Sequence, residues 1–226
     1  MPLSMIKTRL AKLRARDRRF RIFGSSHHKY KSIPDSTDDL ERMERLFALV
    51  LPSDYQRFLF EMGHGTGPYY GVLSLFGTES EIRECFDPYF QEEAEALANL
   101  SLSSPFPVFP IANGEKIERN QNIITNSESL RFVAEFPCNG SIPICHHGSH
   151  KYTVIITTGR FKGSVWDMAL DFSGSLWWSA KRPPGIVRHG YKGVELPNLS
   201  PIPTFFEWYI GWLDQCDADL ADSTTS

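Results

Sequence analysis

The chain has 226 residues, 41% of them hydrophobic, so it can bury a substantial core and is expected to form one globular domain with appendages. The formal net charge of −3 is unevenly divided, since residues 1–31 hold ten Lys and Arg and one acid, whereas the rest holds 14 bases and 26 acids. No apolar run approaches the ~20 residues of a membrane-spanning helix and no secretory signal is visible, so we expect a cytoplasmic protein.

The basic N-terminal arm places Leu3, Ile6, Leu10 and Leu13 at helical spacing with cations between them. This pattern is typical of an amphipathic helix, and it leaves open a solvated, partly disordered tail, a targeting helix or an anchor to an anionic surface. Nucleic-acid binding through the arm alone would be weak and salt-sensitive, because the arm has no base-reading module. We assign residues 1–32 to an arm outside the fold, residues 33–216 to the domain and residues 217–226 to an acidic, polar tail.

Two short helices are predicted next. Ser36 or Thr37 can cap the first, and an apolar face follows it along the chain. "LPSD" ends that helix and begins another at Pro52, which Gly63 stops. The residues expected to face the core are Leu40, Met43, Leu46, Phe47 and Val50 in the first helix, and Tyr55, Phe58, Leu59 and Met62 in the second.

"GTGPYYGVLSLFG" is predicted to form glycine turns and then a strand through Leu75. It lacks the strand-loop-helix order and the Gly-Lys-Ser/Thr of a nucleotide loop. Residues 79–100 form an acidic helical stretch interrupted by Pro88, in which Glu92, Glu93 and Glu95 indicate a solvated face more than paired acid and base carboxylates.

The second half of the chain has β-strand patterns. A strand with a turn at Asn113-Gly114, one or two short strands in residues 121–136, and strong strands at residues 152–157 and 163–169 are expected. Residues 173–203 cannot be placed from the pattern, and "LWW", which contains Trp177 and Trp178, is interpreted as an exposed loop contact. The final aromatic segment is predicted to be a helix docked on the sheet.

"HHGSH" concentrates three histidines beside a cysteine. A zinc site would need His146 or His147 with His150 and a third ligand, but a glycine turn supplies no common face for them. Cys145 and its neighbouring histidines should point to opposite faces of a strand, which does not favour a Cys/His dyad. We therefore expect a turn in which Gly148 has positive φ, with no metal and no cofactor, and four reduced, mostly buried cysteines: Cys85, Cys138, Cys145 and Cys216.

The order of three segments, "LPSDYQRFLFEMGHGTGPYYGVLSL", "GSIPICHHGSHKYTVIITTGRFKGSVW" and "FFEWYIGWLD", resembles the SUKH superfamily of Smi/Knr-type cell-wall-assembly regulators and toxin-immunity proteins. The basic arm has no counterpart in that family, and "NGEKIERNQN" matches it poorly. The positions that carry the resemblance and are expected to be structural are Leu51, Pro52, Tyr55, Phe58, Gly63, Gly71, Pro143, Gly148, Gly163, Trp166, Trp208 and Trp212.

The resemblance implies an α+β fold in which N-terminal helices and a C-terminal aromatic helix flank a single mixed or mostly antiparallel sheet. It also implies a non-enzymatic domain that binds a protein, as an immunity protein occluding a toxin's active site or as a regulatory scaffold. A metal-dependent hydrolase centred on "HHGSH" is the alternative from another class. Because residues 32–226 are acidic, we expect a basic, nuclease-type toxin partner. The expected contact residues are Tyr69, Tyr70, His146, His147, His150 and Lys151.

Overall fold

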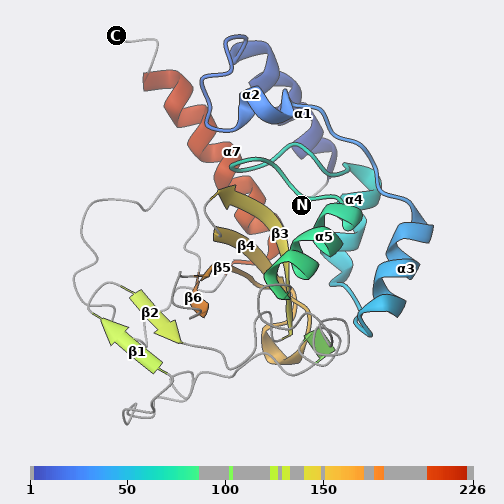
Figure 1. Cartoon of the computed structure of the whole chain (residues 1–226). Helices are drawn as coiled ribbons and strands as arrows, with labels where there is room; N and C mark the ends of the chain where they lie inside the picture. The colour runs from blue at the N-terminus through green and yellow to red at the C-terminus, as the bar shows by residue number, and fades with distance from the viewer. Residues whose placement is uncertain are drawn as a thin grey trace.

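A computed structural model describes residues 3–86, 102–103, 123–126, 129–132, 140–148, 151–170, 176–180 and 203–222. The fold is α+β, as predicted, with the described helices above and to one side of an antiparallel sheet in the view of Figure 1. The described helices are α1 (Leu3–Arg16), α2 (Ser25–His28), α3 (Thr37–Leu46), α4 (Ser53–Glu61), α5 (Leu75–Phe86) and α7 (Phe205–Asp222).

Capping residues set the ends of α3 and α4 as the sequence predicted. The Ser36 hydroxyl accepts a hydrogen bond from the Asp39 backbone N–H at 3.1 Å, and Pro52 precedes the first residue of α4. Gly63 has φ +91° and follows the last turn of α4. The predicted core face is confirmed except at Val50, which is 61% exposed because α3 ends at Leu46.

The main sheet has four antiparallel strands in the order β3-β4-β5-β6. They are β3 (Ser141–Gly148), β4 (Lys151–Ile156), β5 (Val165–Leu170) and β6 (Leu176–Ala180). The short 3-10 helix η2 (Gly159–Phe161) connects β4 to β5. A separate antiparallel pair, β1 (Ile123–Asn126) and β2 (Ser129–Phe132), confirms the short strands predicted in residues 121–136.

α7 packs through its aromatic face on α4. The Phe205 ring lies 5.0 Å from Tyr55 and 4.8 Å from Phe58, between ring centroids, and the Tyr209 hydroxyl donates to the Thr66 carbonyl at 3.0 Å. Aromatic rings at these separations and tilts stabilise a core beyond their buried area. The start of α7 is joined to the sheet by a bridge between Ser164 and Thr204. The aromatic helix is thus part of the core, but it packs mainly on α1 and α4, whereas we expected it to dock on the sheet, which it meets at the bridge before its first turn.

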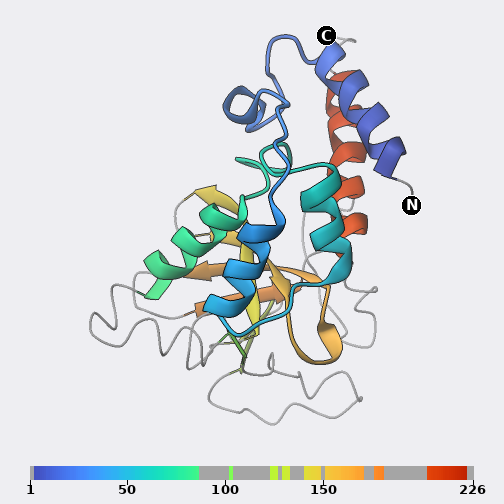
Figure 2. The same ribbon diagram turned by 90° about the vertical axis from the view of Figure 1, so that its right-hand side faces the viewer.

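The basic arm belongs to the fold, which corrects our expectation that it lies outside. α1 runs beside α7 in both ribbon views (Figures 1 and 2). Leu3, Ile6 and Leu13 are at most 3% exposed. The Arg9 guanidinium donates to Asp217 at 2.8 Å and lies 2.8 Å from Asp214. The predicted helix is confirmed, but its apolar face is buried against the domain.

One buried carboxylate organises the chain between α1 and α3. Asp17, 1% exposed, accepts hydrogen bonds from the backbone N–H of Arg21 and from the hydroxyls of Ser25 and Tyr30 at 2.6 to 2.9 Å. Although burial raises the pKa of Asp17, these hydrogen bonds outweigh it and hold the pKa below its usual value. The only acid of the arm therefore fixes the path of residues 17–30.

Three further expectations are wrong. The segment before Leu75 forms a single bridge, between Val72 and Cys145, and Leu75 begins α5, which starts earlier than the predicted helix at residue 79. "LWW" lies in β6, paired with β5, and not in a loop. α7 continues to Asp222 with Leu220 buried, into the segment assigned to a tail. In each case pairing or packing with another segment decides the local structure.

The residues of the family resemblance lie mainly in the core or at turns. Leu51, Tyr55, Phe58, Trp166, Trp208 and Trp212 are at most 7% exposed. Gly63, Gly71, Gly148 and Gly163 all have positive φ, and Pro143 lies within β3 next to an irregularity in the pairing. Glu92, Glu93, Glu95, the Asn113-Gly114 turn, Cys138 and His150 lie outside the described residues, as do most of residues 173–203.

Candidate functional site

The glycine turn after α4 presents two tyrosines beside the arm. Gly71 has φ +100°, and a Cβ there would lie 1.6 Å from the Gly65 carbonyl oxygen. Gly24, just before α2, has φ +81°, and its Cβ would lie 1.4 Å from the Tyr69 carbonyl oxygen. Only glycine fits such close backbone approaches. The arm therefore crosses directly over the turn, leaving Tyr70 41% exposed.

The C-terminal end of β3 reaches the same turn. His147 stacks on Tyr69 with ring centroids 3.6 Å apart and planes 19° apart. Its Nε2 lies 2.7 Å from the Thr153 hydroxyl on β4, which donates to the Asp167 carboxylate on β5 at 3.3 Å. Since the hydroxyl donates to Asp167, it accepts from the His147 Nε2–H. This chain of bonds across three strands fixes the imidazole against Tyr69.

His146, the preceding residue, packs among other rings. It lies 6.0 Å from Tyr70 and 5.0 Å from Tyr152, between ring centroids. Cys145 is fully buried and its thiol donates to the Pro68 carbonyl at 3.1 Å. Cys145 and Cys216 are both free and buried, as predicted for these two cysteines. In this arrangement the Cys145 thiol joins β3 to the turn.

Two arm residues that the sequence analysis did not select complete this surface. Phe23, 64% exposed, lies 6.2 Å from Tyr69 and 6.0 Å from Tyr70, between ring centroids, and His27 lies 5.5 Å from Tyr70. The sequence shows them as an aromatic residue and a histidine in a basic arm, which does not reveal that they meet the tyrosines of the turn. We call the following set the aromatic–histidine surface: Phe23, His27, Tyr69, Tyr70, His146 and His147.

The structure thus brings together four of the six residues predicted to contact a partner. Lys151, the fifth, is exposed at the start of β4 and pairs with Gly148 at the end of β3. A Cβ on Gly148, whose φ is +94°, would lie 3.6 Å from the Tyr70 ring, so this strand end adjoins the surface. His146 and His147 lie in the strand, whereas the sequence analysis placed them in the turn. The positive φ predicted for Gly148 is confirmed.

The described histidines are not arranged as a set of metal ligands. Within the described ranges, no three His, Cys, Asp or Glu side chains are grouped so that they could hold a metal ion. His150, which the metal hypothesis requires, lies outside those ranges. His147 already uses its Nε2 in the bond to Thr153. The described contacts give these two histidines roles in packing.

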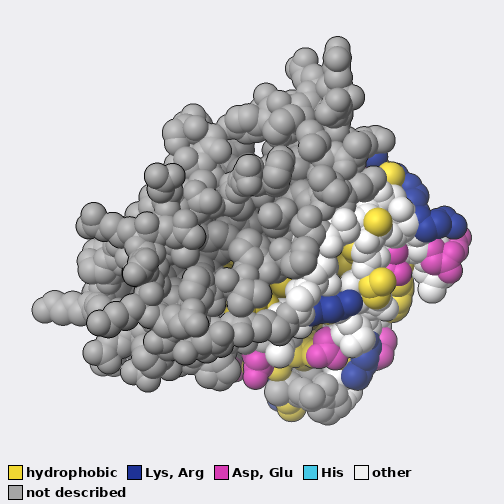
Figure 3. Space-filling model, turned by 90° about the horizontal axis from the view of Figure 1, so that it is seen from below, with side chains coloured by type: hydrophobic (Ala, Val, Ile, Leu, Met, Phe, Trp, Pro, Cys, Tyr) yellow, Lys and Arg dark blue, Asp and Glu magenta, His cyan; other side chains and the backbone are white. Residues whose placement is uncertain are grey.

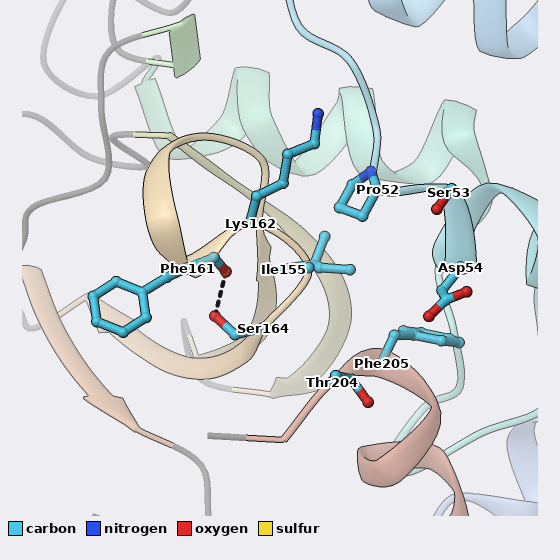
Figure 4. Close-up of a pocket in the computed structure, with 10 residues that line it drawn as sticks. Pro52, Ser53, Asp54, Ile155, Phe161, Lys162, Ser164, Thr204 and Phe205 are labelled. Atoms are coloured by element: carbon cyan, nitrogen blue, oxygen red, sulfur yellow. Dashed lines mark hydrogen bonds between the residues drawn. The ribbon is translucent and has the colours of Figure 1, made fainter. Parts of the chain in front are cut away.

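A groove of about 560 Å³ lies elsewhere, between the start of α4, the β4–β5 connection and the start of α7 (Figure 4). The Phe161 ring is directed out of it toward Trp166, 5.8 Å away, and the Ser164 hydroxyl donates to the Phe161 carbonyl at 2.6 Å. Its charged lining residues, Asp54 and Lys162, are both exposed. The groove is lined by Pro52, Ser53, Asp54, Ile155, Phe161, Lys162, Gly163, Ser164, Thr204 and Phe205.

Charges of both signs occur on the opposite end of the molecule from the arm. Seen from below, the described part of the surface has Lys and Arg side chains interspersed with Asp and Glu side chains (Figure 3). α3 exposes both Glu41 and Arg42, and Arg42 pairs with Glu79 at 2.7 Å. The net charge of residues 32–226 is therefore a poor guide to the potential at any one face.

Comparison with known proteins gives no relative: no protein-family model, curated protein or solved structure matches this chain. Among the helices of the described residues, none is long and apolar enough to cross a membrane. The function is therefore inferred from the aromatic–histidine surface and from the residues of the SUKH resemblance.

Proposed function

We propose that this chain is a SUKH-like, non-enzymatic domain that binds a protein through the aromatic–histidine surface, and that it acts as an immunity protein that covers the active site of a cognate toxin. The observation that carries the proposal is one contiguous set of rings. Phe23 and Tyr70 are exposed in this set, Phe23 packs on Tyr69, and His147 stacks on Tyr69. Exposed aromatic rings set on a rigid base are typical of the residues that dominate protein–protein binding energy.

Rigidity supports a binding role. The turn is fixed by the close backbone contact at Gly71, the arm by the four hydrogen bonds to Asp17, and His147 by the bond to Thr153. A surface that is ordered before binding loses little conformational entropy when the partner arrives. Such a surface suits occlusion of a cleft, for which the binding domain needs no reactive group.

The residues of the family resemblance add a second line of support. They come from α4, from β3 to β5 and from α7, and most of them meet in one buried core or form the turns around it. Positions scattered over the chain that share one core are what a common fold would require. The resemblance covers both immunity proteins and regulatory scaffolds, so the identity of the partner separates the two roles.

A photocrosslinking experiment tests the proposal. Tyr70 is replaced by p-benzoylphenylalanine in the cells that make the protein, and the adducts are identified by mass spectrometry. The matched control carries the same residue at Phe76, which is 67% exposed on α5. We expect a specific protein adduct from position 70 and none from position 76.

The identity of the adduct separates the parts of the proposal. A toxin whose growth arrest is relieved by the wild-type chain, but not by a variant with Phe23→Ser and Tyr70→Ser, supports the immunity role. An endogenous regulatory protein as the adduct contradicts immunity and leaves protein binding. Equal crosslinking from both positions contradicts the aromatic–histidine surface as the binding site.

A further inference from the structure

The arm gives the aromatic–histidine surface a strongly positive border. Arg18, Arg19, Arg21, Lys29 and Lys31 are all exposed in the segment that carries Phe23 and His27. Arg21 precedes Phe23 by two residues, and Lys29 follows His27 by two. Lys151 is exposed at the strand end that adjoins Tyr70. Exposed cations therefore lie within a few residues of Phe23 and His27 on the arm, and at the strand end that adjoins Tyr70 on the sheet.

Compensating carboxylates are missing from the segments that build this surface. Residues 18–34, 62–78 and 140–152 contain no Asp or Glu, and Asp17 is buried with all its bonds inside the arm. Asp167 on β5 accepts a hydrogen bond from Thr153, lies 3.8 Å from His147 and keeps its negative charge, so it offsets part of the cation charge. Uncompensated cations at the border of an apolar patch raise its potential and favour a partner of negative charge.

We propose that the aromatic–histidine surface takes an acidic protein segment, whose carboxylates face the cations of residues 18–31 and Lys151 while an apolar side chain packs on Phe23 and Tyr70. This inference rests on the proposed function and specifies the chemistry of the partner at the contact. It reverses the sequence-based expectation of a basic partner, which came from the net charge of residues 32–226 and excluded the arm. The arm is packed on the domain and carries exposed cations on both sides of Phe23 and His27 in the sequence.

The geometry of the rings favours a protein segment over a single-stranded nucleic acid, the other polyanion with affinity for aromatic residues. Base stacking requires open, flat ring faces. Here Phe23 meets Tyr69 at 81° and Tyr70 at 58°, and His27 meets Tyr70 at 80°, while His147 stacks on Tyr69 at 3.6 Å. The faces of the two tyrosines are therefore partly covered by neighbouring rings. Such a cluster offers a small, uneven apolar patch that suits a Leu or Phe side chain.

Fluorescence anisotropy with three labelled probes tests this proposal on the full chain. The probes are a short peptide of Asp and Glu interspersed with Phe and Leu, the same peptide with Lys at each acidic position, and a short oligothymidylate. We expect the acidic peptide to bind, with an affinity that falls steeply as salt rises toward physiological ionic strength, because exposed charges are then screened. The basic peptide should not bind.

Matched variants locate the binding. Arg21→Glu with Lys29→Glu should weaken the acidic peptide at least about tenfold, and Phe23→Ser should weaken it by several-fold. The controls are Lys162→Glu, an exposed cation at the groove, and Phe76→Ala, an exposed aromatic residue on α5, and neither should change the affinity. Circular dichroism confirms that each variant is folded.

Each contrary result has a definite meaning. Tighter binding of the basic peptide, wild-type affinity in the doubly substituted variant, no binding of the acidic peptide, or tighter binding of oligothymidylate would each overturn the acidic-segment proposal. Crosslinking from position 70 separates failure of this inference from failure of the proposed function. A protein adduct with a basic contact face overturns this inference alone. Acidic-peptide binding without any protein adduct in cells overturns the proposed function alone.

Discussion

The packing of α1 on the domain can be tested at two neighbouring residues. Ile6 is fully buried, whereas Met5 is 42% exposed on the same helix turn. Replacing Ile6 by Ala removes three carbons from the core, at about 0.8 kcal/mol each, and leaves a cavity that adds to the cost. Because α1 lies at the edge of the core and can relax, we expect a loss of about 3 kcal/mol in the free energy of unfolding.

For a domain of this size a loss of about 3 kcal/mol lowers the melting temperature by about 6 to 12 °C. Met5→Ala is the control and should change stability by less than about 0.5 kcal/mol. Arg9→Ala should cost less than about 1 kcal/mol, since its partners Asp214 and Asp217 are 61% and 44% exposed and the pairs are screened by water.

Thermal and urea unfolding followed by circular dichroism measure these differences. An unchanged m-value would confirm that the variants unfold from the same native structure. If Ile6→Ala and Met5→Ala unfold at the same midpoint, α1 is not packed on α7, and the positive border of the aromatic–histidine surface would lose its fixed position.

Other residues give three further expectations. Burial lowers the pKa of His28 to about 4, so as pH falls from about 6.5 to 4 the unfolded chain takes up the proton first and stability falls by about 3 kcal/mol. His28→Asn should remove this pH dependence in unfolding experiments between pH 4 and 7. Gly71→Ala should destabilise the fold by more than about 4 kcal/mol and Gly159→Ala by about 1 kcal/mol. Both glycines have positive φ, but an added Cβ meets backbone at Gly71 and nothing at Gly159. Equal denaturant midpoints for the two variants would refute this reasoning. His147→Asn should cost about 1 to 2 kcal/mol, more than a surface turn residue, through loss of the bond to Thr153; a change below about 0.5 kcal/mol in urea unfolding would count against that bond.

The helices α3, α4 and α7 and the strands β4 and β5 were predictable because their signals are local. A Ser hydroxyl followed by free backbone N–H groups caps α3, Pro52 suits the start of α4, and Gly63 suits the residue after it. The aromatic spacing from Phe205 to Trp212 predicts one buried helix face whatever covers it. These elements follow from backbone sterics, capping and hydrophobic periodicity.

Four residues of the site were selected by similar reasoning, since Tyr69, Tyr70, His146 and His147 lie next to glycines that had to form turns. Phe23 and His27 were missed because the contact with Tyr70 joins segments more than 40 residues apart. No local signal tells which of several exposed rings will meet.

Tertiary structure also decided the role of the arm. The spacing of Leu3, Ile6 and Leu13 predicts an amphipathic helix, but whether its apolar face is buried depends on a partner face on α7, about 200 residues later in the chain. That docking places the cations of residues 18–31 around the aromatic–histidine surface and changes the expected charge of the partner. The sequence by itself determined where helices, turns and charges lie along the chain, and only the packing of distant segments decided which charges surround the site, because electrostatic potential depends on distance in space.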